Sequence, residues 1–441
     1  MKYYIENFGC QMNEHDVEKV GSLLHIAGFE KAGEAGAADV VIVNTCCVRQ
    51  KAEQKFYSLM GRLRSLKRKK GILLGVTGCI AQLEQENLFE RLPFVDFSLG
   101  PSSIHKVREA IESASRKSRF GDFSDNGCAA SLHLRPQAEA QNIKAYVTIM
   151  KGCDNYCSYC IVPYVRGREV SRESGDILDE IRILADKGVR EVTLLGQNVN
   201  SYNRGRDDLS FPDLLARVND IRGIERIRFV TSHPKDLSTE LIGCFGNLSK
   251  LCEHIHLPFQ SGSNKLLGLM NRGYTIEQYK EKIALLKSRC EDIAITADCI
   301  VGFPGEDAKD FEATMDLVRH VRFDGIFSFC FSPRKQTAAE TLPDRVAGEL
   351  ARERLHALQS LQKGITRERL REAEGTRVEV LVDGRSKNSD QELTGRTRTN
   401  RIVNFEGPEQ LVGEFVEIDI VKGYANSLRG AYPKRKEVCD A

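Results

Sequence analysis

The segment "KGCDNYCSYC" at residues 151–160 places Cys153, Cys157 and Cys160 within eight residues. A structural zinc site normally needs four protein ligands around one tetrahedral ion, and this segment supplies three. A lone C-x-x-C pair can act as a redox dithiol, but three cysteines exceed what that chemistry requires. Three thiolates on a four-iron cluster leave one iron open, and an open iron can bind a small molecule and pass it an electron. The spacing therefore favours an iron–sulfur site.

A zinc site stays open as an alternative if a fourth ligand reaches the three cysteines. The candidates are Cys128 and His133, which lie in a segment rich in Gly, Ser, Asn and Ala at residues 119–140. That composition predicts an interdomain linker, which would have to fold back to supply the ligand.

Three more cysteines, Cys10, Cys46 and Cys79, each follow a predicted strand near the start of the chain. Functional groups in open α/β sheets gather outside the carboxyl ends of the strands, so we predict that these three thiols converge on one metal site. Cys47 stands beside Cys46 and could substitute for it, but successive side chains of an extended strand point to opposite faces, so we expect only one to reach the site. Packing as small buried side chains is the competing interpretation.

The elements around these cysteines follow from the hydrophobic pattern. Alternating strands and helices in the first 118 residues predict a mostly parallel open sheet, and six further strand–helix units predict a partial (β/α)6 barrel or a wound sheet. An Arg- and Leu-rich helix at 345–372 precedes short runs with Gly turns, which predict a small β-barrel. The predicted strands are 2–8, 39–45, 72–78, 94–100, 145–150, 191–196, 226–232, 254–259, 294–302 and 325–331, with N-terminal helices at 14–28 and 49–70.

Composition places the chain among ordinary globular proteins. It has 441 residues, enough for two or three domains, and a net charge of +2, which does not by itself indicate a nucleic-acid partner. No apolar stretch approaches the roughly 20 residues of a membrane span, and the first residues lack the pattern of a signal peptide. We therefore expect a cytoplasmic protein with no membrane association. Fourteen cysteines in a reducing compartment favour metal binding or catalysis over structural disulfides.

The segment "CDNYCSYC" resembles the cluster motif of the radical S-adenosylmethionine enzymes. The resemblance implies that the methionyl amine and carboxylate of S-adenosylmethionine chelate the open iron, and that electron transfer then yields a 5′-deoxyadenosyl radical. Tyr159 falls at the motif position that lies beside the adenine in that family. Taken alone, Tyr159 is equally well explained as a packing aromatic.

Longer segments resemble the methylthiotransferases, and most closely the tRNA 2-methylthio-adenosine synthases that act on isopentenylated adenosine. These segments are "GCQMNEHD" (9–16), "NTCCVRQKAEQK" (44–55), "GCDNYCSYCIVPYVRGREVSR" (152–172) and "LLGQNVNSY" (194–202). The resemblance runs over the whole chain, and its C-terminal part resembles the TRAM RNA-binding domain. It implies an N-terminal methylthiotransferase domain (1–118), a linker (119–140), a radical enzyme core (141–372) and a TRAM barrel (373–437).

The family resemblance implies two 4Fe–4S clusters, one held by Cys10, Cys46 and Cys79 and the other by the central triad. It implies that one S-adenosylmethionine methylates a sulfur on the N-terminal cluster. A second S-adenosylmethionine gives the radical that activates carbon 2 of an isopentenylated (dimethylallyl) adenosine at tRNA position 37. Its partners would be a tRNA anticodon loop and a reductant protein of the flavodoxin or ferredoxin type, and nothing demands more than a monomer.

Other positions are candidates for cofactor binding. Gln197 and Asn198 could contact cofactor or substrate, or cap the following segment. Arg166 and Arg168 could bind the methionyl carboxylate, an RNA phosphate or a neighbouring acid, because arginine suits bidentate recognition of either anion. Glu306 ends the segment "DCIVGFPGE" (298–306), which resembles the family's segment near the ribose and adenine, although a buried strand with a Gly-Pro turn explains it equally well.

Clusters of basic residues could bind RNA phosphates. Arg396, Arg398 and Arg401 fall in one strand–turn region, and basic runs occur at 62–70 and 434–436. A solvated surface is the ordinary explanation for such runs, so RNA binding rests mainly on the resemblance.

Three alternatives remain open from the sequence. The same chemistry could act on threonylcarbamoyl-adenosine of tRNA or on a ribosomal-protein aspartate. A non-catalytic RNA-binding module with structural zinc would contain no iron. A radical enzyme with one cluster would use Cys10, Cys46 and Cys79 only for packing.

Overall fold

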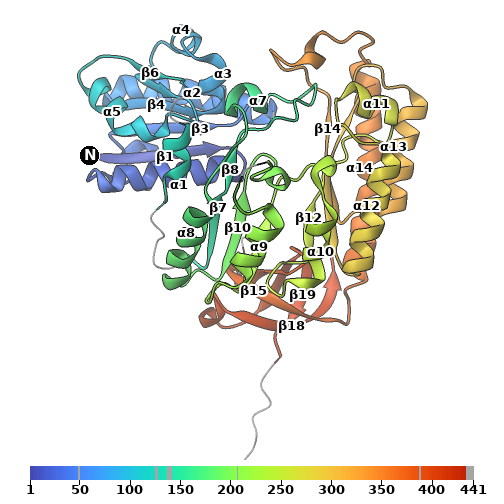
Figure 1. Cartoon of the computed structure of the whole chain (residues 1–441). Helices are drawn as coiled ribbons and strands as arrows, with labels where there is room; N and C mark the ends of the chain where they lie inside the picture. Colours follow the sequence, from blue (N-terminus) through green and yellow to red (C-terminus); the bar gives the residue numbers. More distant parts are fainter. Residues whose placement is uncertain (48–49, 125–127, 137–141, 206, 387–388, 434–441) are drawn as a thin grey trace, which may run out of the picture. The chain divides into compact units, whose positions relative to one another are not determined.

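The computed structural model describes residues 1–47, 50–124, 128–136, 142–205, 207–386 and 389–433 (Figure 1). The chain divides into two compact units. The first unit contains residues 1–225, 229–231 and 332–341, and the second contains residues 226–228, 232–331 and the chain from 342 onward. No helix among the described residues is long and apolar enough to cross a membrane.

The first unit begins with the open sheet that the sequence predicts. Its six strands are all parallel, with the order β2-β1-β3-β4-β5-β6. The sixth strand lies within the segment predicted to be a linker, so the sheet continues beyond residue 118. The strands are β1 (Lys2–Phe8), β2 (Glu30–Lys31), β3 (Val40–Thr45), β4 (Leu73–Gly78), β5 (Phe97–Leu99) and β6 (Phe120–Asp122).

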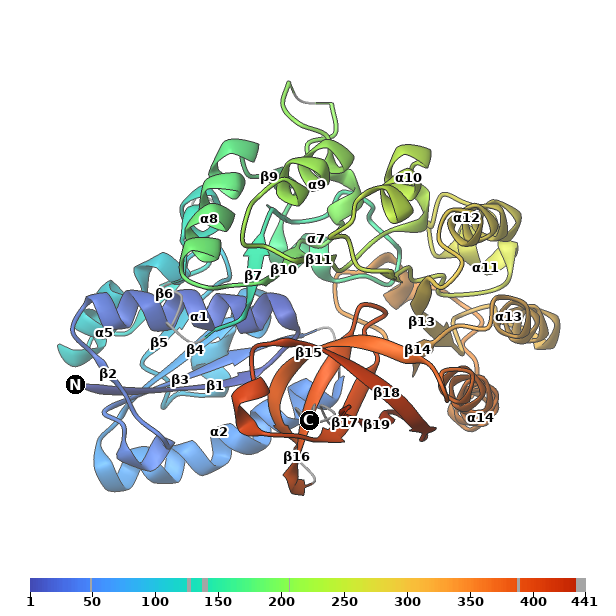
Figure 2. The same cartoon turned by 90° about the horizontal axis from the view of Figure 1, so that it is seen from below.

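Helices cover both faces of this sheet. Helices α1 (Gln11–Ile26) and α5 (Val107–Ser115) lie on one face, and α2 (Gln50–Lys70) lies on the other (Figure 2). Strand β3 is buried along its whole length because its alternate side chains enter two separate cores. Two short helices, α3 (Cys79–Glu84) and α4 (Asn87–Arg91), follow β4.

The rest of the first unit begins the strand–helix series. Strand β7 (Lys144–Thr148) pairs in parallel with β10 (Glu191–Leu195), and the short strands β8 (Met150–Lys151) and β9 (Val170–Ser171) pair in antiparallel. The backbone N–H of Val230 donates a hydrogen bond to the Leu194 carbonyl of β10. The helices are α6 (Cys128–His133), α7 (Val162–Arg166), α8 (Ser174–Asp186) and α9 (Phe211–Asn219).

The second unit continues the series with parallel strands in the order β12-β13-β14. Strand β11 (Arg226–Phe229) divides between the units, and its Ile227 bridges Leu251 in parallel. All six predicted central strands are thus present, which confirms the strand–helix prediction. The elements are β12 (His254–His256), β13 (Ala294–Val301), β14 (Gly325–Cys330), α10 (Thr239–Asn247), α11 (Asn264–Leu269), α12 (Ile276–Arg289), α13 (Ala308–Val321) and α14 (Gly348–Arg371).

Local sequence signals fix the ends of two of these helices. Thr275 and Asp307 form capping boxes at α12 and α13, in which side chain and backbone satisfy each other's donors. The chain ends in a closed five-stranded barrel with the order β15-β16-β17-β19-β18, as the short runs predict. Its strands are β15 (Arg377–Ser386), β16 (Ser389–Thr397), β17 (Ile402–Glu406), β18 (Phe415–Gly423) and β19 (Leu428–Ala431).

Candidate functional site

Cys10, Cys46 and Cys79 lie at the carboxyl ends of three adjacent strands. Strands β1, β3 and β4 are neighbours, and their last paired row contains Phe8, Thr45 and Gly78. Each cysteine follows this row by one or two residues, and the Cys46 N–H donates to the Phe8 carbonyl at 3.0 Å. The parallel register therefore brings together thiols that are far apart in sequence.

Hydrogen bonds link these thiols. The bond from Cys46 lowers the pKa of Cys10 to about 6, and bonds from Cys46 and Cys47 hold the pKa of Cys79 well below its usual value. Cys46 itself has a raised pKa because it donates to both neighbours. Cys46 and Cys79 are buried and Cys10 is exposed. The group offers thiolates at an accessible edge, as cluster ligation requires.

Cys47 also contacts the Cys79 thiol, so side-chain alternation does not by itself separate Cys47 from Cys46. Strand β3 ends at Thr45, so Cys46 and Cys47 lie beyond the extended segment. Side-chain alternation applies to strands and therefore does not govern this pair. Cys47 is 1% exposed and packs in the core beneath α2, whereas Cys46 contacts both Cys10 and Cys79.

Two buried asparagines support the loops that carry these cysteines. Asn13 donates to Asn44 Oδ1 at 3.2 Å, and Asn44 donates to the Asn13 carbonyl at 3.0 Å. Gly78 has a φ of +94°, and a Cβ there would lie 2.3 Å from Asn44 Oδ1. Only glycine allows this approach. Sequence reasoning did not single out either asparagine, although Asn13 stands within the quoted segment "GCQMNEHD".

Cys153, Cys157 and Cys160 lie in the loop between β8 and α7, and each is partly exposed. The Cys160 N–H donates to the Cys157 carbonyl at 2.9 Å, which folds the loop into a turn. Gly152 begins the loop with a φ of +81°, and a Cβ there would lie 1.9 Å from the Arg168 carbonyl. The loop therefore depends on glycine at this position.

Among the residues predicted to bind cofactor, Gln197 supports this loop, and Tyr159 lies within it. Gln197 accepts a hydrogen bond from the Gly152 N–H, so its side chain holds the start of the loop. Asn198 is buried and does not cap the following 3₁₀ turn with its side chain, which removes one of the two roles considered for it. Tyr159 is partly exposed within the loop. His133, a candidate fourth zinc ligand, pairs with Asp176 at 3.0 Å; the side chain of Cys128 lies outside the described residues.

Arg166 and Arg168 both pair with acids, but in different surroundings. Arg168 is exposed and lies 3.3 Å from Asp154 of the same loop. Arg166 is buried and lies 2.8 Å from Asp16 of α1. Burial alone would lower the pKa of Arg166, but Asp16 and the thiolates of Cys79 and Cys10 raise it well above its usual value. Of the partners considered for Arg166, the structure shows the neighbouring acid.

Glu306 belongs to the second unit, where it stabilises a turn. It accepts from the Gly302 N–H at 2.7 Å and pairs with Arg354 of α14 at 2.7 Å, and both side chains are buried. Burial raises the pKa of Glu306 despite these partners. The predicted cofactor contact is thus joined by a structural role that the sequence did not indicate.

Replacing Arg354 by methionine is expected to lower the free energy of unfolding by about 3–5 kcal/mol at neutral pH, because it leaves the buried Glu306 carboxylate unpaired. Folding raises the pKa of Glu306 above 4.5, so the folded chain binds more protons and this carboxyl's contribution to stability falls as the pH rises through that pKa. The variant should therefore recover stability towards pH 5. Urea unfolding at pH 5 and pH 8, with the exposed Arg352→Met as control, checks this; an equal loss at both pH values would contradict it.

Three arginines of the C-terminal barrel, Arg396, Arg398 and Arg401, make contacts within the protein. Arg398 pairs with Glu253 at 2.6 Å and Arg401 with Asp324 at 2.9 Å, while Arg396 donates to Asn400. These contacts attach the β16–β17 hairpin to the strand–helix part of the second unit. Arg398 and Arg401 therefore have a structural role, which the sequence interpretation as phosphate-binding or surface residues did not include. The basic run at 434–436 lies outside the described residues.

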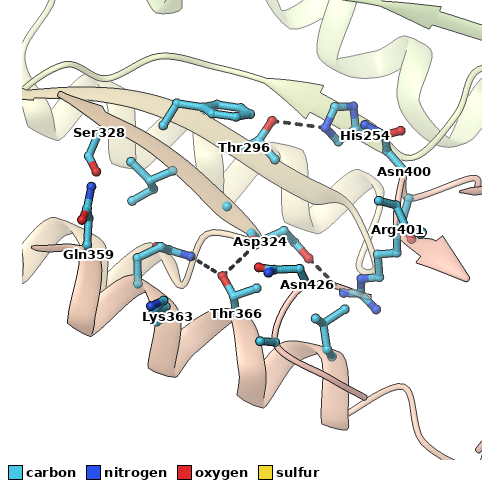
Figure 3. A pocket seen from close by; sticks show the side chains of 18 of the residues that line it. His254, Thr296, Asp324, Ser328, Gln359, Lys363, Thr366, Asn400, Arg401 and Asn426 are labelled. Carbon is cyan, nitrogen blue, oxygen red and sulfur yellow. Dashed lines mark hydrogen bonds and ion pairs between the residues drawn. The ribbon is translucent and has the colours of Figure 1, made fainter. Parts of the chain in front are cut away.

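A cavity of about 590 Å³, lined by both apolar and polar side chains, lies beside this hairpin, within the second unit (Figure 3). Strands β12–β14, helix α14 and the barrel all contribute to it. Thr366 of α14 donates to the Asp324 carbonyl at 3.0 Å, and Gln359 of the same helix lies beside Ser328 of β14 (Figure 3). Lys363 has no hydrogen bond or ion pair with any residue that the structure describes.

The two cysteine triads fit clusters better than single ions. Among the described residues, no three His, Cys, Asp or Glu side chains surround one point closely enough to bind a single ion. Ligands of a four-iron cluster bind different irons and need not meet at one point. The connected thiols of Cys10, Cys46 and Cys79 and the glycine-dependent loop of the second triad suit this wider arrangement.

Three family models match successive parts of the chain. The "Uncharacterized protein family UPF0004" matches residues 2–100, the "Radical SAM superfamily" matches residues 147–318, and the "TRAM domain" matches residues 371–431. The structure of TsrM from Kitasatospora setae, a radical S-adenosylmethionine methyltransferase with cobalamin and a [4Fe-4S] cluster bound, resembles the model with a TM-score of 0.57. It is 14% identical and covers 77% of this chain and 74% of its own, so the likeness shows the fold.

Curated relatives match almost the whole chain. A tRNA-2-methylthio-N(6)-dimethylallyladenosine synthase of Geobacter metallireducens is 53% identical over 431 residues, covering 97% of both chains. A protein of the same name from Syntrophus aciditrophicus is 49% identical over 97% of this chain and 93% of its own. With relatives this similar over nearly its whole length, the chain belongs to the family of the tRNA-2-methylthio-N(6)-dimethylallyladenosine synthases.

Proposed function

We propose that this chain adds a methylthio group to carbon 2 of isopentenylated adenosine at position 37 of tRNA, with two S-adenosylmethionine molecules and sulfur carried on an auxiliary cluster. The observation that carries the proposal is the convergence of Cys10, Cys46 and Cys79 at three adjacent strand ends, in the same unit as the C-x-x-x-C-x-x-C loop. One site supplies the radical chemistry and the other the sulfur. Relatives that bear the synthase name, at about half identity, support the substrate.

Each group of residues has a defined task in this proposal. Cys153, Cys157 and Cys160 hold one 4Fe–4S cluster, and Cys10, Cys46 and Cys79 hold the second. When bound, the first cluster would supply the electron that cleaves S-adenosylmethionine. Gln197 keeps the loop in shape through the Gly152 N–H, and Ser158 ties it to Ala339 through a 2.7 Å backbone hydrogen bond. These contacts hold the loop in a shape that orients the thiols.

Further assignments extend the proposal to the remaining predicted residues. Tyr159 and Asn198 contact the nucleoside part of S-adenosylmethionine, and Glu306 shapes the turn after β13. Arg168 is exposed enough to exchange Asp154 for an anion of cofactor or RNA. We place the methylthiotransferase domain at 1–118 together with β6 (Phe120–Asp122), which extends its sheet into the segment 119–140 predicted as the linker. We place the radical core at 141–372 and the TRAM barrel at 373–437.

The proposed partners follow from the reaction. A splayed adenosine in a tRNA anticodon loop is a base that a protein can reach, because it is not stacked in a duplex. The radical step needs a one-electron donor of the flavodoxin or ferredoxin type. We propose that the protein works in the cytoplasm as a monomer.

Nucleoside mass spectrometry of bulk tRNA, with and without the gene, tests the reaction. We expect 2-methylthio-isopentenyladenosine to disappear in the deletion strain and its unthiolated precursor to accumulate, and we expect the full chain to restore it. If that nucleoside persists, the substrate assignment is wrong. Loss of the methylthio group from threonylcarbamoyl-adenosine or from a ribosomal-protein aspartate would then identify the alternative substrates.

We propose that Lys363, with the exposed Phe327 and Phe329 nearby, forms part of the RNA-binding surface. A cation beside aromatic faces suits unpaired nucleotides, which offer phosphates and open rings. Lys363→Glu should weaken binding of an anticodon stem–loop RNA and lower the slope of log K against log salt by at least about 1. The matched control is Lys309→Glu, which makes the same charge change at an exposed position outside the cavity. Equal effects of both variants on affinity and slope would contradict this placement.

A further inference from the structure

Arg166 and Asp16 connect the two cysteine sites by an ion pair inside the first unit. Arg166 is the last residue of α7 and follows Cys160 by six residues, and Asp16 lies on α1, six residues after Cys10. The two side chains are 3% and 8% exposed, and their charged atoms are 2.8 Å apart. A buried ion pair is costly to desolvate and contributes little net stability, so its placement beside the thiols calls for another explanation.

The guanidinium of Arg166 is incompletely satisfied by Asp16. Both of its terminal nitrogens are buried, and neither has an aligned hydrogen bond with any residue that the structure describes. The thiol of Cys79 lies against the guanidinium, and the charge of Cys10 also acts on it. A planar group with five donors and one carboxylate neighbour retains the capacity to donate to another anion.

A second buried arginine of the same unit, Arg172, forms an ion pair whose role is structural. Arg172 pairs with Glu180 at 2.6 Å and also donates to the carbonyls of Thr148 and Asp176. These acceptors fix its guanidinium to the backbone. Arg166 has no such acceptors among the described residues, and its free donors face sulfur.

We propose that Arg166 is a positioning residue for the N-terminal site: its guanidinium, anchored by Asp16, holds the negative charge of the cluster and of any anionic sulfur bound to it. The inference rests on the proposed function in one respect, that Cys10, Cys46 and Cys79 bind an iron–sulfur cluster. A fixed positive charge in a buried site favours the cluster state with the extra electron. Because Arg166 follows the central triad in sequence, it also ties the two sites together.

The test measures the midpoint potential of the N-terminal cluster by mediated redox titration followed by electron paramagnetic resonance. The full chain carries Cys153→Ala, Cys157→Ala and Cys160→Ala, so that one cluster reports. Adding Arg166→Gln should shift the midpoint potential of this cluster to a more negative value. The expected shift is at least about 59 mV, which for a one-electron couple changes the ratio of oxidised to reduced cluster tenfold at a fixed potential. Arg166→Lys keeps the charge and should restore most of the potential.

Two further variants make the result decisive. Arg168→Gln removes an exposed arginine from the same segment and should leave the potential unchanged. Asp16→Asn removes the anchoring negative charge and should shift the potential in the opposite direction to Arg166→Gln, so the proposal stays testable if Arg166→Gln fails to fold. A cluster with an unchanged potential, or shifts of the same sign in both variants, would overturn the role of Arg166 alone. A background chain that binds no iron would overturn the N-terminal cluster as well.

Discussion

A chain with Cys157→Ala should leave isopentenyladenosine unmodified in tRNA and should bind about half the iron and acid-labile sulfide of the wild type. Cys157 is partly exposed and its backbone carbonyl forms the turn that places Cys160, so the substitution removes a thiolate without disturbing the turn. In the proposed site, two thiolates are too few to hold a four-iron cluster for which the wild-type loop supplies three. Activity should fall to the background of the deletion strain, because the radical originates at this site.

The matched control is Cys290→Ser, a change at a half-buried cysteine outside both triads. Burial raises the pKa of Cys290 to about 11, so its thiol is a poor ligand at neutral pH. The control should keep full iron content and activity. If Cys157→Ala kept its iron, the central triad would not be a cluster site and the zinc alternative would regain support.

The second prediction with a large expected effect distinguishes the roles of the adjacent cysteines Cys46 and Cys47. Cys46→Ala should abolish the N-terminal cluster and the methylthiolation, because Cys46 is the thiol that contacts both Cys10 and Cys79. Cys47→Ala should keep the cluster and cost about 1 kcal/mol of stability, because Cys47 packs in the core beneath α2 and its truncation leaves a small cavity.

Iron content and acid-labile sulfide of the two variants, together with tRNA nucleoside analysis, distinguish the two cysteines. The Cys46→Ala chain should retain the central cluster and its electron paramagnetic resonance signal after reduction. Loss of iron from Cys47→Ala, with retention in Cys46→Ala, would show that the ligand roles are reversed.

The strand pattern predicted the positions of the cysteines well. The first strand was predicted at 2–8 and is observed at Lys2–Phe8, and the next two are shorter by one residue each at the start. Because hydrophobic runs mark the buried strands and parallel strands align their carboxyl ends, the approach of Cys10, Cys46 and Cys79 followed from the sequence. Six central strands were found in the same way.

Contacts made by long charged side chains could not be predicted. Arg398 reaches Glu253 and Arg166 reaches Asp16, and nothing in a local pattern shows which acid a flexible arginine will meet. Strands β2 and β6 of the N-terminal sheet were missed because two and three residues carry too little pattern. Side-chain alternation did not apply to Cys46 and Cys47 because the chain bends immediately after β3. That only one of them binds a cluster stays a prediction.

The two cysteine triads also differ in when they can come into existence as the protein is made. Cys153, Cys157 and Cys160 fall within eight residues, so a newly synthesised chain can gather them at little entropic cost. Cys10 and Cys79 meet only after β1, β3 and β4 have paired. Iron delivered before that pairing would meet fourteen cysteines with no geometry to select among them. If both triads bind clusters as proposed, the N-terminal cluster can form only after the sheet has paired, and a chain with only the central cluster would precede the complete protein.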